Sequence, residues 1–443
     1  MQLTGSAPAP LSTVTDGGGN YSFAGLNVGG NYTVRPVATA TVAFTPALRN
    51  YPDIPATKTG QNFVTGAPPP PAPQPLVATP GQVIISEFRL RGASGAADEY
   101  VELYNNTDSA ITVSTSDGSD GWALDGSQSD GTSRLTIATI PVGAVIPARG
   151  HYLLAAQSYS LNARATGDLF YTPAAGQADV SDNTGLALYS TSTRANFALG
   201  NRLDAVGFTG APATDREGTG LAPISTNDGD YAFIRIIGGS GLYVDSNNNS
   251  ADFTLVSPTG GVGATVATLG APAPENANSP IQRNATIRAS YVDPTISSNL
   301  PPNRVRDVNE TGVNKNLGTL IIRRRFTNNT GQTLTRLRFR IMDITTLNGS
   351  GAGPSQADLR ALNSGDVIIS ALNIKGTTVE LPPAQALGGG LNSAMQVTLP
   401  DVGLAPLVGG ICVTGQCTID VQFKLGVVQG GSYRFFINVE ALP

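Results

Sequence analysis

The chain has 443 residues, which is too long for one ordinary hydrophobic core and predicts about three domains at roughly 150 residues each. Charged residues make up only 13% of the sequence, and four of the 27 basic residues are lysine, a composition unlike that of a cytosolic housekeeping enzyme. The formal net charge is −5, but residues 1–282 carry −10 and residues 283–443 carry +5. Such opposite charges favour head-to-tail contact between copies, although unrelated solvated faces explain them equally well.

The sequence predicts an all-β fold. It is rich in Gly (52) and Pro (31), without the period of three that marks collagen. Abundant Thr, Ser, Val and Asn indicate short strands joined by many turns. No apolar run reaches about 18 residues, so we expect no membrane span. The expected architecture is three tandem immunoglobulin-like β-sandwiches joined by Pro-rich linkers.

Two Pro-rich segments set the predicted domain boundaries. Residues 67–75 should form a semi-rigid polyproline II linker, and residues 271–282 a second, looser linker. The three predicted domains are therefore residues 1–66, 76–270 and 283–443.

The first domain contains a Gly-rich turn followed by alternating aromatic residues. Its pattern is Thr-Asp-Gly-Gly-Gly-Asn-Tyr-Ser-Phe at 15–23, ahead of Tyr-Thr-Val at 32–34. It resembles the carboxypeptidase regulatory-like and prealbumin-like modules, which are small β-sandwiches. Such modules usually begin with a further strand that would precede Met1, so we expect a sandwich lacking its first strand. Its open edges could accept a strand from another chain.

The middle domain resembles the lamin-tail domain, an immunoglobulin-like sandwich that also occurs in bacterial secreted proteins. The resemblance covers most of residues 82–258. It is carried by Val83–Phe88, Asp98–Asn106, Gly121–Leu124, Gly150–Leu154, Gly185–Leu188 and Arg202–Gly207. The resemblance implies an extracellular setting in bacteria but no particular activity.

The third domain shows strands of period two. In residues 335–341, alternation places Leu337, Phe339 and Ile341 toward a core and three arginines, at 336, 338 and 340, toward solvent. We expect this strand to form a hairpin with residues 320–327, and further strands at 417–426 and 432–441. Alternation in residues 320–327 likewise places Arg324 toward the core, where it would need an acidic partner. Residues 355–362 are the one short helix expected.

The sequence offers no recognisable catalytic machinery. His151 is the single histidine and stands where lamin-tail sequences commonly place an aromatic residue, so we interpret it as structural. Glu87, Glu99 and Glu102 could serve as the carboxylates of a glycosidase, but they fall in a fold motif and favour a structural interpretation as well. Rows of arginine form a basic patch, but no aromatic stacking platform accompanies them, so we expect no nucleic-acid binding. We therefore expect no enzyme activity.

Calcium is the one ion that the sequence favours. The loop at 245–252 places oxygen-bearing side chains at short intervals, with Asp245, Asn247, Asn249 and Asp252 as candidate ligands. Asn-rich turns without a metal ion are the common alternative.

The two cysteines of the chain, Cys412 and Cys417, are separated by four residues including a glycine. This spacing predicts a small hairpin closed by a disulfide, and hence an oxidising compartment.

Two hypotheses about function follow. The first is an extracellular structural protein, a surface or filament subunit whose copies join head to tail by β-strand complementation. The second is a cell-surface adhesin or the accessory region of a larger secreted protein, which would bind a polysaccharide or another protein.

Overall fold

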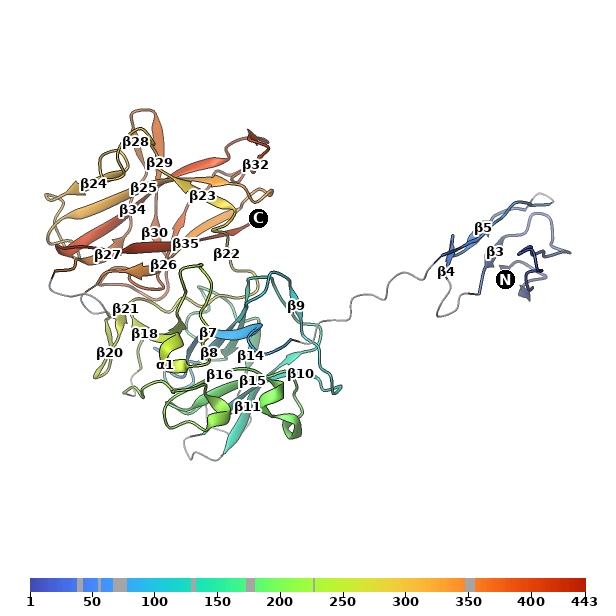
Figure 1. Cartoon of the computed structure of the whole chain (residues 1–443), viewed down its shortest axis with the longest axis horizontal. Helices are drawn as coiled ribbons and strands as arrows, with labels where there is room; N and C mark the ends of the chain where they lie inside the picture. The colour runs from blue at the N-terminus through green and yellow to red at the C-terminus, as the bar shows by residue number, and fades with distance from the viewer. Residues whose placement is uncertain are drawn as a thin grey trace. The chain divides into compact units, whose positions relative to one another are not determined.

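A computed structural model describes residues 1–37, 43–54, 57–66, 78–128, 133–172, 180–225, 228–346 and 355–443. The chain is nearly all β, with 42% strand and 3% helix. It divides into two compact units, unit 1 (Met1–Gln74) and unit 2 (Pro75–Pro443) (Figure 1). The polyproline linker predicted at 67–75 lies outside the described residues.

Unit 1 contains two small sheets. The four-stranded sheet has the order β2-β1-β3-β5, formed by β2 (Leu11–Ser12), β1 (Gln2–Gly5), β3 (Tyr32–Arg35) and β5 (Arg49–Tyr51). A separate antiparallel pair joins β4 (Ala43–Thr45) to β6 (Val64–Gly66). Leu3, Tyr32, Val34 and Ile54 are the buried residues of the core, and half-buried Tyr21 and Phe23 pack against them.

The first part of unit 2 contains two facing sheets (Figure 1). The seven-stranded sheet consists, in order, of β14 (Leu169–Tyr171), β13 (His151–Ala156), β8 (Tyr100–Asn105), β7 (Val83–Arg89), β17 (Ala232–Arg235), β18 (Phe253–Ser257) and β21 (Thr268–Leu269). The four-stranded sheet consists of β11 (Arg134–Pro141), β10 (Gly121–Ser127), β15 (Gly185–Tyr189) and β16 (Arg202–Gly207). Trp122, Leu124 and Leu186 of the second sheet pack with Ile85 and Leu103 of the first in one core.

Short elements complete this sandwich. Two small pairs are β9 (Ile111–Thr112) with β12 (Val145–Ile146), and β19 (Gly261–Val262) with β20 (Thr265–Val266). The helical turns are η1 (Arg194–Asn196), η2 (Leu199–Asn201), η3 (Ala213–Asp215) and α1 (Asn249–Asp252).

The second part of unit 2 is another pair of sheets. The five-stranded sheet consists of β22 (Ile281–Gln282), β35 (Phe435–Leu442), β26 (Arg336–Ile344), β31 (Ala394–Val397) and β30 (Thr378–Val379). The larger sheet consists of β23 (Ile287–Ser290), β25 (Thr319–Asn328), β34 (Thr418–Gln429), β29 (Leu372–Gly376) and β28 (Val367–Ile369), with β24 (Arg304–Asp307) on β25 and β27 (Asp358–Leu362) on β34. A separate hairpin pairs β32 (Leu407–Val408) with β33 (Ile411–Cys412).

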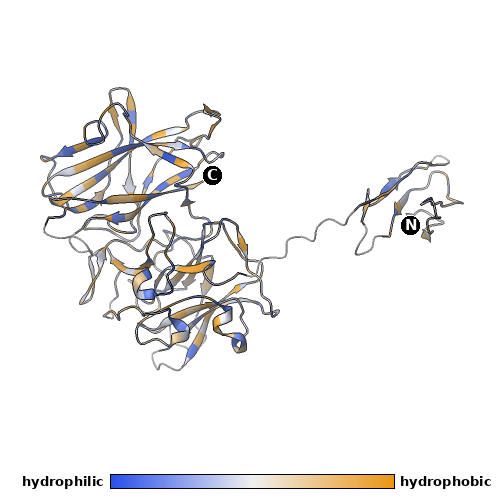
Figure 2. Ribbon diagram, viewed as in Figure 1, coloured by the Kyte–Doolittle hydropathy of each residue, from blue (hydrophilic) through white to orange (hydrophobic). Residues whose placement is uncertain are grey.

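The core of this second sandwich confirms the alternation predicted for residues 335–341. Leu337, Phe339 and Ile341 are almost completely buried, and the Phe339 ring centroid lies 4.8 Å from that of Phe326 and 4.9 Å from that of Phe423. Figure 2 shows hydrophobic stretches along the strands of both sandwiches. Alternation therefore identified the core-facing side of this strand correctly.

Three local predictions for this part are wrong. β25 and β26 lie in different sheets and form no hairpin, because the chain between them crosses from one sheet to the other. Residues 358–362 form strand β27, because they pair with β34, and not the predicted helix at 355–362. Arg338 and Arg340 do not face solvent but are 3% and 2% exposed.

The arginines of β25 also differ from the expectation. Arg323 is buried and donates to Gln422 Oε1 at 3.1 Å and to the Pro302 carbonyl at 3.1 Å. Arg324 is only half-buried, donates to the Arg323 carbonyl and lies over the Tyr291 ring at 5.0 Å. The acidic contact predicted for Arg324 is thus replaced by a carbonyl and an aromatic ring, which are also favourable partners for a guanidinium.

The segment predicted as a loose linker at 271–282 is largely buried between the two sandwiches. Ala271, Ala273 and Glu275 are each about 1% exposed or less. Gly270 forms an isolated parallel β-bridge with Leu391 of the second sandwich, and Ala271 N donates to the Leu391 carbonyl at 3.1 Å. The two sandwiches therefore share a buried interface within one compact unit.

Candidate functional site

The candidate site is a set of buried ionisable side chains between the two sandwiches of unit 2, which we name the interface charge network. Its members come from both sandwiches and from the buried segment that joins them. They are Glu87, Glu102, His151, Arg164, Glu275, Arg338, Arg340, Glu380 and Glu440.

The first sandwich contributes one face of its seven-stranded sheet. On β8, Val101 and Leu103 point into the core, so Tyr100 and Glu102 point to the opposite face. On β13, His151 is diagonal to Glu102, because it pairs with Tyr104 in the antiparallel register. Strands β7, β8 and β13 are buried along their whole length, since each face of the sheet is covered. The polar side chains on the outer face are therefore enclosed and not solvated.

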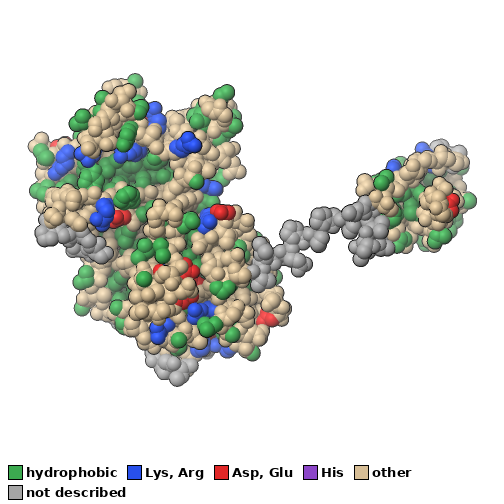
Figure 3. Space-filling view, viewed as in Figure 1, with side chains coloured by type: hydrophobic (Ala, Val, Ile, Leu, Met, Phe, Trp, Pro, Cys, Tyr) green, Lys and Arg blue, Asp and Glu red, His purple; other side chains and the backbone are tan. Residues whose placement is uncertain are grey.

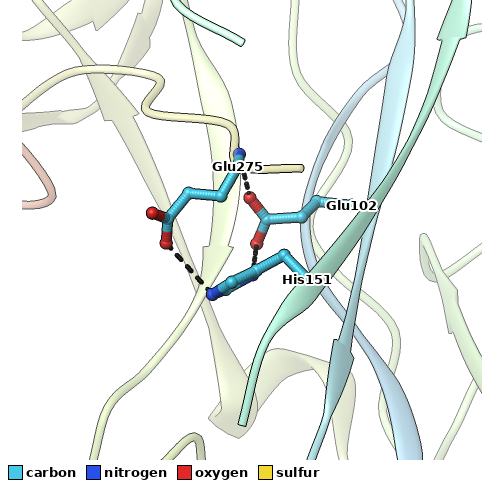
Figure 4. Close-up of side chains that lie close together, drawn as sticks. All are labelled: Glu102, His151 and Glu275. Carbon is cyan, nitrogen blue, oxygen red and sulfur yellow. Dashed lines mark hydrogen bonds and ion pairs between the residues drawn. The ribbon is translucent and has the colours of Figure 1, made fainter. Parts of the chain in front are cut away.

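His151 lies between two carboxylates from different elements (Figure 4). Its Nδ1 is 2.9 Å from Glu102 Oε1, and its Nε2 is 3.0 Å from Glu275 Oε2. A neutral imidazole donates from one nitrogen only. Within this triad the Nδ1 contact is a hydrogen bond, whereas the Nε2 contact is a close approach of the imidazole to the Glu275 carboxylate.

The triad is linked to two arginines of the second sandwich. Arg340 Nη2 lies 2.8 Å from Glu275 Oε2, and Arg338 pairs with the other oxygen of Glu275. Both arginines also bind Glu440 on the neighbouring strand β35, at 2.7 Å from Arg338 Nε and 2.9 Å from Arg340 Nε. Glu275, in the segment between the sandwiches, therefore links His151 of the first sandwich to the two arginines of the second.

Glu87 forms a second connection across the interface. Its carboxylate accepts hydrogen bonds from the Tyr100 hydroxyl at 2.6 Å, Ala273 N at 2.8 Å and Asn392 Nδ2 at 2.9 Å. Asn392 belongs to the second sandwich, and its Oδ1 accepts from Arg340 at 2.7 Å. Burial raises the pKa of Glu87, and the nearby Glu102 carboxylate raises it further.

Arg164 and Glu380 extend the network at its edge. Their closest atoms are 3.2 Å apart, and Arg336 binds the other oxygen of Glu380 at 2.7 Å. Burial lowers the pKa of Arg164 to about 10, although Glu380 opposes the shift. The network is thus a chain of paired charges, which is the condition under which ionised groups tolerate burial.

This arrangement suits a structural role better than a catalytic or metal-binding one. Glu102, His151 and Glu275 could each offer one atom within 4.8 Å of the others. However, the two nitrogens of His151 face different carboxylates, and two arginines already neutralise Glu275. The side chains of the triad are 1–5% exposed, so no substrate reaches them in this structure. No histidine is visible on the face of the molecule shown in Figure 3.

Glu99, the third carboxylate considered from the sequence, lies apart from this set. It is buried, and the hydroxyl of Tyr171 on β14 donates to its Oε2 at 3.3 Å. The structure therefore brings Glu87 and Glu102 into the interface charge network and leaves Glu99 outside it.

The four predicted calcium ligands differ in the partners that their side chains have. Asn249 Oδ1 accepts from Gly207 N and Glu217 N at 3.0 and 2.8 Å. Asp252 accepts from Ser246 N and Oγ at 2.9 and 2.6 Å, and Asp245 lies 3.2 Å from Arg235. Asn247 is exposed at a turn with φ 56°. Protein donors thus already occupy oxygens of three of these side chains.

The predicted disulfide is not formed. Cys412 and Cys417 are free and half-buried, and the Cys412 thiol donates to the Gly415 carbonyl at 3.5 Å. The hairpin in this region is β32–β33, which ends at Cys412, so Cys417 belongs to the following turn. A hydrogen bond with the Cys417 thiol raises the pKa of Cys412.

Comparisons with family models, curated proteins and solved structures found no match to this chain. The resemblances to the lamin-tail and prealbumin-like modules therefore stay predictions. Among the described residues, no helix is long and apolar enough to cross a membrane.

The sequence did not indicate six members of the network, which are Arg164, Glu275, Arg338, Arg340, Glu380 and Glu440. Glu275 follows an Ala-Pro repeat that is typical of linkers, and Arg338 and Arg340 occupy the polar positions of an alternating strand. The sequence does indicate that both faces of the seven-stranded sheet are covered, because residues 83–88 and 100–104 carry apolar side chains on both faces.

The network predicts a loss of stability in acid. Burial would raise the pKa of Glu440, but Arg338 and Arg340 lower it to about 2. A carboxyl whose pKa is lower in the folded state stabilises the fold above its unfolded pKa of about 4.5, and this contribution disappears as the pH falls toward 2. We expect the free energy of unfolding, measured in urea, to decrease over this range by an amount on the order of 3 kcal/mol. Glu440→Gln should make the decrease shallower, and an unchanged slope in the variant would contradict the assignment.

Proposed function

We propose that this chain is an extracellular structural protein whose copies assemble into a surface layer or filament by adding a β-strand of one copy to unit 1 of the next. The observation that carries the proposal is the segment Tyr21–Leu26 of unit 1. Tyr21, Phe23 and Leu26 are half-buried against the core, while Ser22 and Ala24 are exposed. Over Tyr21–Ala24 this alternation is that of a β-strand with one face on a core, and Gly25, at φ 73°, ends it.

The segment nevertheless pairs with no strand among the described residues of unit 1. It follows a tight turn in which Asp16 Oδ1 accepts from Gly18 N and Asn20 N at 2.9 and 2.8 Å. The Tyr21 side chain is fixed by its hydroxyl, which donates to the Gln61 carbonyl at 2.6 Å. The stretch Tyr21–Ala24, alternating and unpaired among the described residues, is the kind of edge to which another strand adds.

The interface charge network supports a structural role for unit 2. It joins two sandwiches into one compact unit by buried, mutually paired charges, and it leaves those charges out of contact with substrates. Glu275 belongs to the acidic residues 1–282, and it pairs inside this unit with Arg338 and Arg340 of the basic residues 283–443. The opposite charges of the two parts therefore form contacts within one copy, besides any contact between copies.

A substitution on the open edge tests the proposal. Ser22→Pro removes one backbone donor and leaves the inward-facing Tyr21 and Phe23 unchanged. We expect the concentration at which the full chain assembles, followed by sedimentation velocity, to rise at least tenfold. Ser22→Ala keeps the backbone donor and serves as the matched control, so its assembly should equal that of the parent chain. Equal assembly of all three proteins would contradict the proposal, and a chain that stays monomeric would favour the adhesin hypothesis.

A further inference from the structure

A second cluster of acidic groups lies inside the first sandwich of unit 2, away from the interface charge network. Asp204 is on β16, Glu217 follows η3, and Asp245 precedes α1. Each offers a carboxylate oxygen, and these three atoms lie within 4.8 Å of one another. Only Asp245 belongs to the loop in which the sequence predicted a calcium site.

Glu217 is the member whose position requires an explanation. Its side chain is 7% exposed, and its Oε1 lies 3.2 Å from Arg202 Nη2. Its Oε2 is buried and accepts no hydrogen bond from any residue that the structure describes. A carboxylate oxygen of Glu217 lies within 4.8 Å of one of Asp204. Two ionised carboxylates are acceptors only, so their approach is favourable only with a proton or a cation between them.

The arginines around the cluster leave an excess of negative charge. Arg235 Nη2 lies 2.6 Å from Asp204, and its Nη1 lies 3.2 Å from Asp245 and 3.6 Å from Asp252. With Arg202 on Glu217, two cations therefore face four carboxylates. One shared proton would remove half of this excess, whereas one divalent cation would remove all of it.

The available ligand atoms are oxygens, and Asp245 is the member of the cluster with access to solvent. Asp204 is 1% exposed and already accepts from Ile85 N at 2.6 Å and from Ala205 N at 2.9 Å, so it is rigidly held. Asp245 is 17% exposed, so water can reach it and complete a coordination shell. Carboxylate and water oxygens in an irregular arrangement suit calcium better than magnesium, which requires near-octahedral geometry.

We propose that Asp204, Glu217 and Asp245 bind a divalent cation of the hard, oxygen-preferring class, with calcium as the expected ion. Glu217 and Asp245 supply the ligands, and Asp204 adds its charge beside them. The site connects β16 with two loops that are otherwise joined through Arg235 and Asn249. Calcium is thus expected to stabilise the first sandwich and not to take part in a reaction.

Calorimetric titration of the chelator-treated full chain with calcium chloride at pH 7.5 tests the proposal. We expect saturable binding of one ion per chain, with a dissociation constant of about 10⁻⁴ to 10⁻³ M, as in other extracellular modules. Glu217→Gln and Asp245→Asn should each weaken binding at least tenfold. Asp401→Asn, which removes the same charge from an exposed site, should leave binding unchanged.

Thermal unfolding of the same proteins separates a cation from a shared proton. Burial raises the pKa of Glu217 to about 8, with Asp204 and Asp245 adding to the shift. A proton alone would stabilise the fold at low pH, and this contribution would be lost as the pH rises from about 4.5 to about 8, with no response to calcium. We expect calcium to raise the Tm of the parent chain at pH 7.5. No saturable heat, no rise in Tm, or equal binding by folded Glu217→Gln and Asp245→Asn would overturn the proposal.

Discussion

Replacing Arg340 with alanine is expected to lower the free energy of unfolding of unit 2 by about 3–5 kcal/mol. The guanidinium is 2% exposed and holds Glu275 at 2.8 Å, Glu440 at 2.9 Å and Asn392 at 2.7 Å. Its removal leaves two buried carboxylates with less compensating charge, and that uncompensated charge accounts for most of the loss. Urea unfolding followed by circular dichroism measures the effect.

Arg434→Ala is the matched control for this prediction. Arg434 also pairs with a carboxylate, Asp343 at 2.7 Å, but the two side chains are 44% and 39% exposed. Exposed ion pairs contribute about 0–1 kcal/mol, so the control should be nearly neutral. If the Arg340 variant were as stable as the control, the network would contribute little to the stability of the interface.

Phe339→Ala should destabilise the first sandwich as well as the second, although Phe339 lies only in the second. The side chain is fully buried against Phe326 and Phe423, and truncation of such a phenylalanine costs about 3–5 kcal/mol. The single tryptophan of the chain, Trp122, is buried in the first sandwich and donates to the Ser114 carbonyl at 2.8 Å. Because the two sandwiches share a buried interface, we expect them to unfold together. The urea midpoint reported by Trp122 fluorescence should therefore fall.

The control for this experiment is Phe436→Ala, on the same sheet. Phe436 is 59% exposed, so its truncation should leave the midpoint almost unchanged. A Trp122 midpoint that stays constant in Phe339→Ala, while circular dichroism shows an additional early transition, would mean that the sandwiches unfold independently.

Much of the fold could be predicted, because it depends on local patterns. The class followed from composition, and the core-facing residues of β26 followed from alternation. What covers the other face of a strand depends on distant residues. Arg338 and Arg340 looked solvated because nothing near them in sequence indicates that a second sandwich packs over β26. Residues 358–362 likewise became a strand through pairing with β34, about 65 residues away.

The site was harder to predict than the fold. Interpreting His151, Glu87 and Glu102 as structural agrees with their burial, but their partners could not be foreseen. The backbone N of Glu275 donates to Glu102, which is 173 residues earlier in the chain. The segment that contains Glu275 has prolines typical of a spacer. The residue type shows that a side chain can ionise. Whether that side chain is buried, and which charge it pairs with, depends on tertiary packing. The acidic cluster shows the same limit, since Asp204 and Glu217 are remote in sequence from Asp245.

Assembly of the purified full chain can be followed by negative-stain electron microscopy over a range of concentrations. The open edge at Tyr21–Ala24 predicts linear or sheet-like assemblies that grow with concentration and are reduced in Ser22→Pro but not in Ser22→Ala. Isolated monomers at every concentration, from a chain shown to be folded by its Trp122 fluorescence, would show that the copies do not join through this edge.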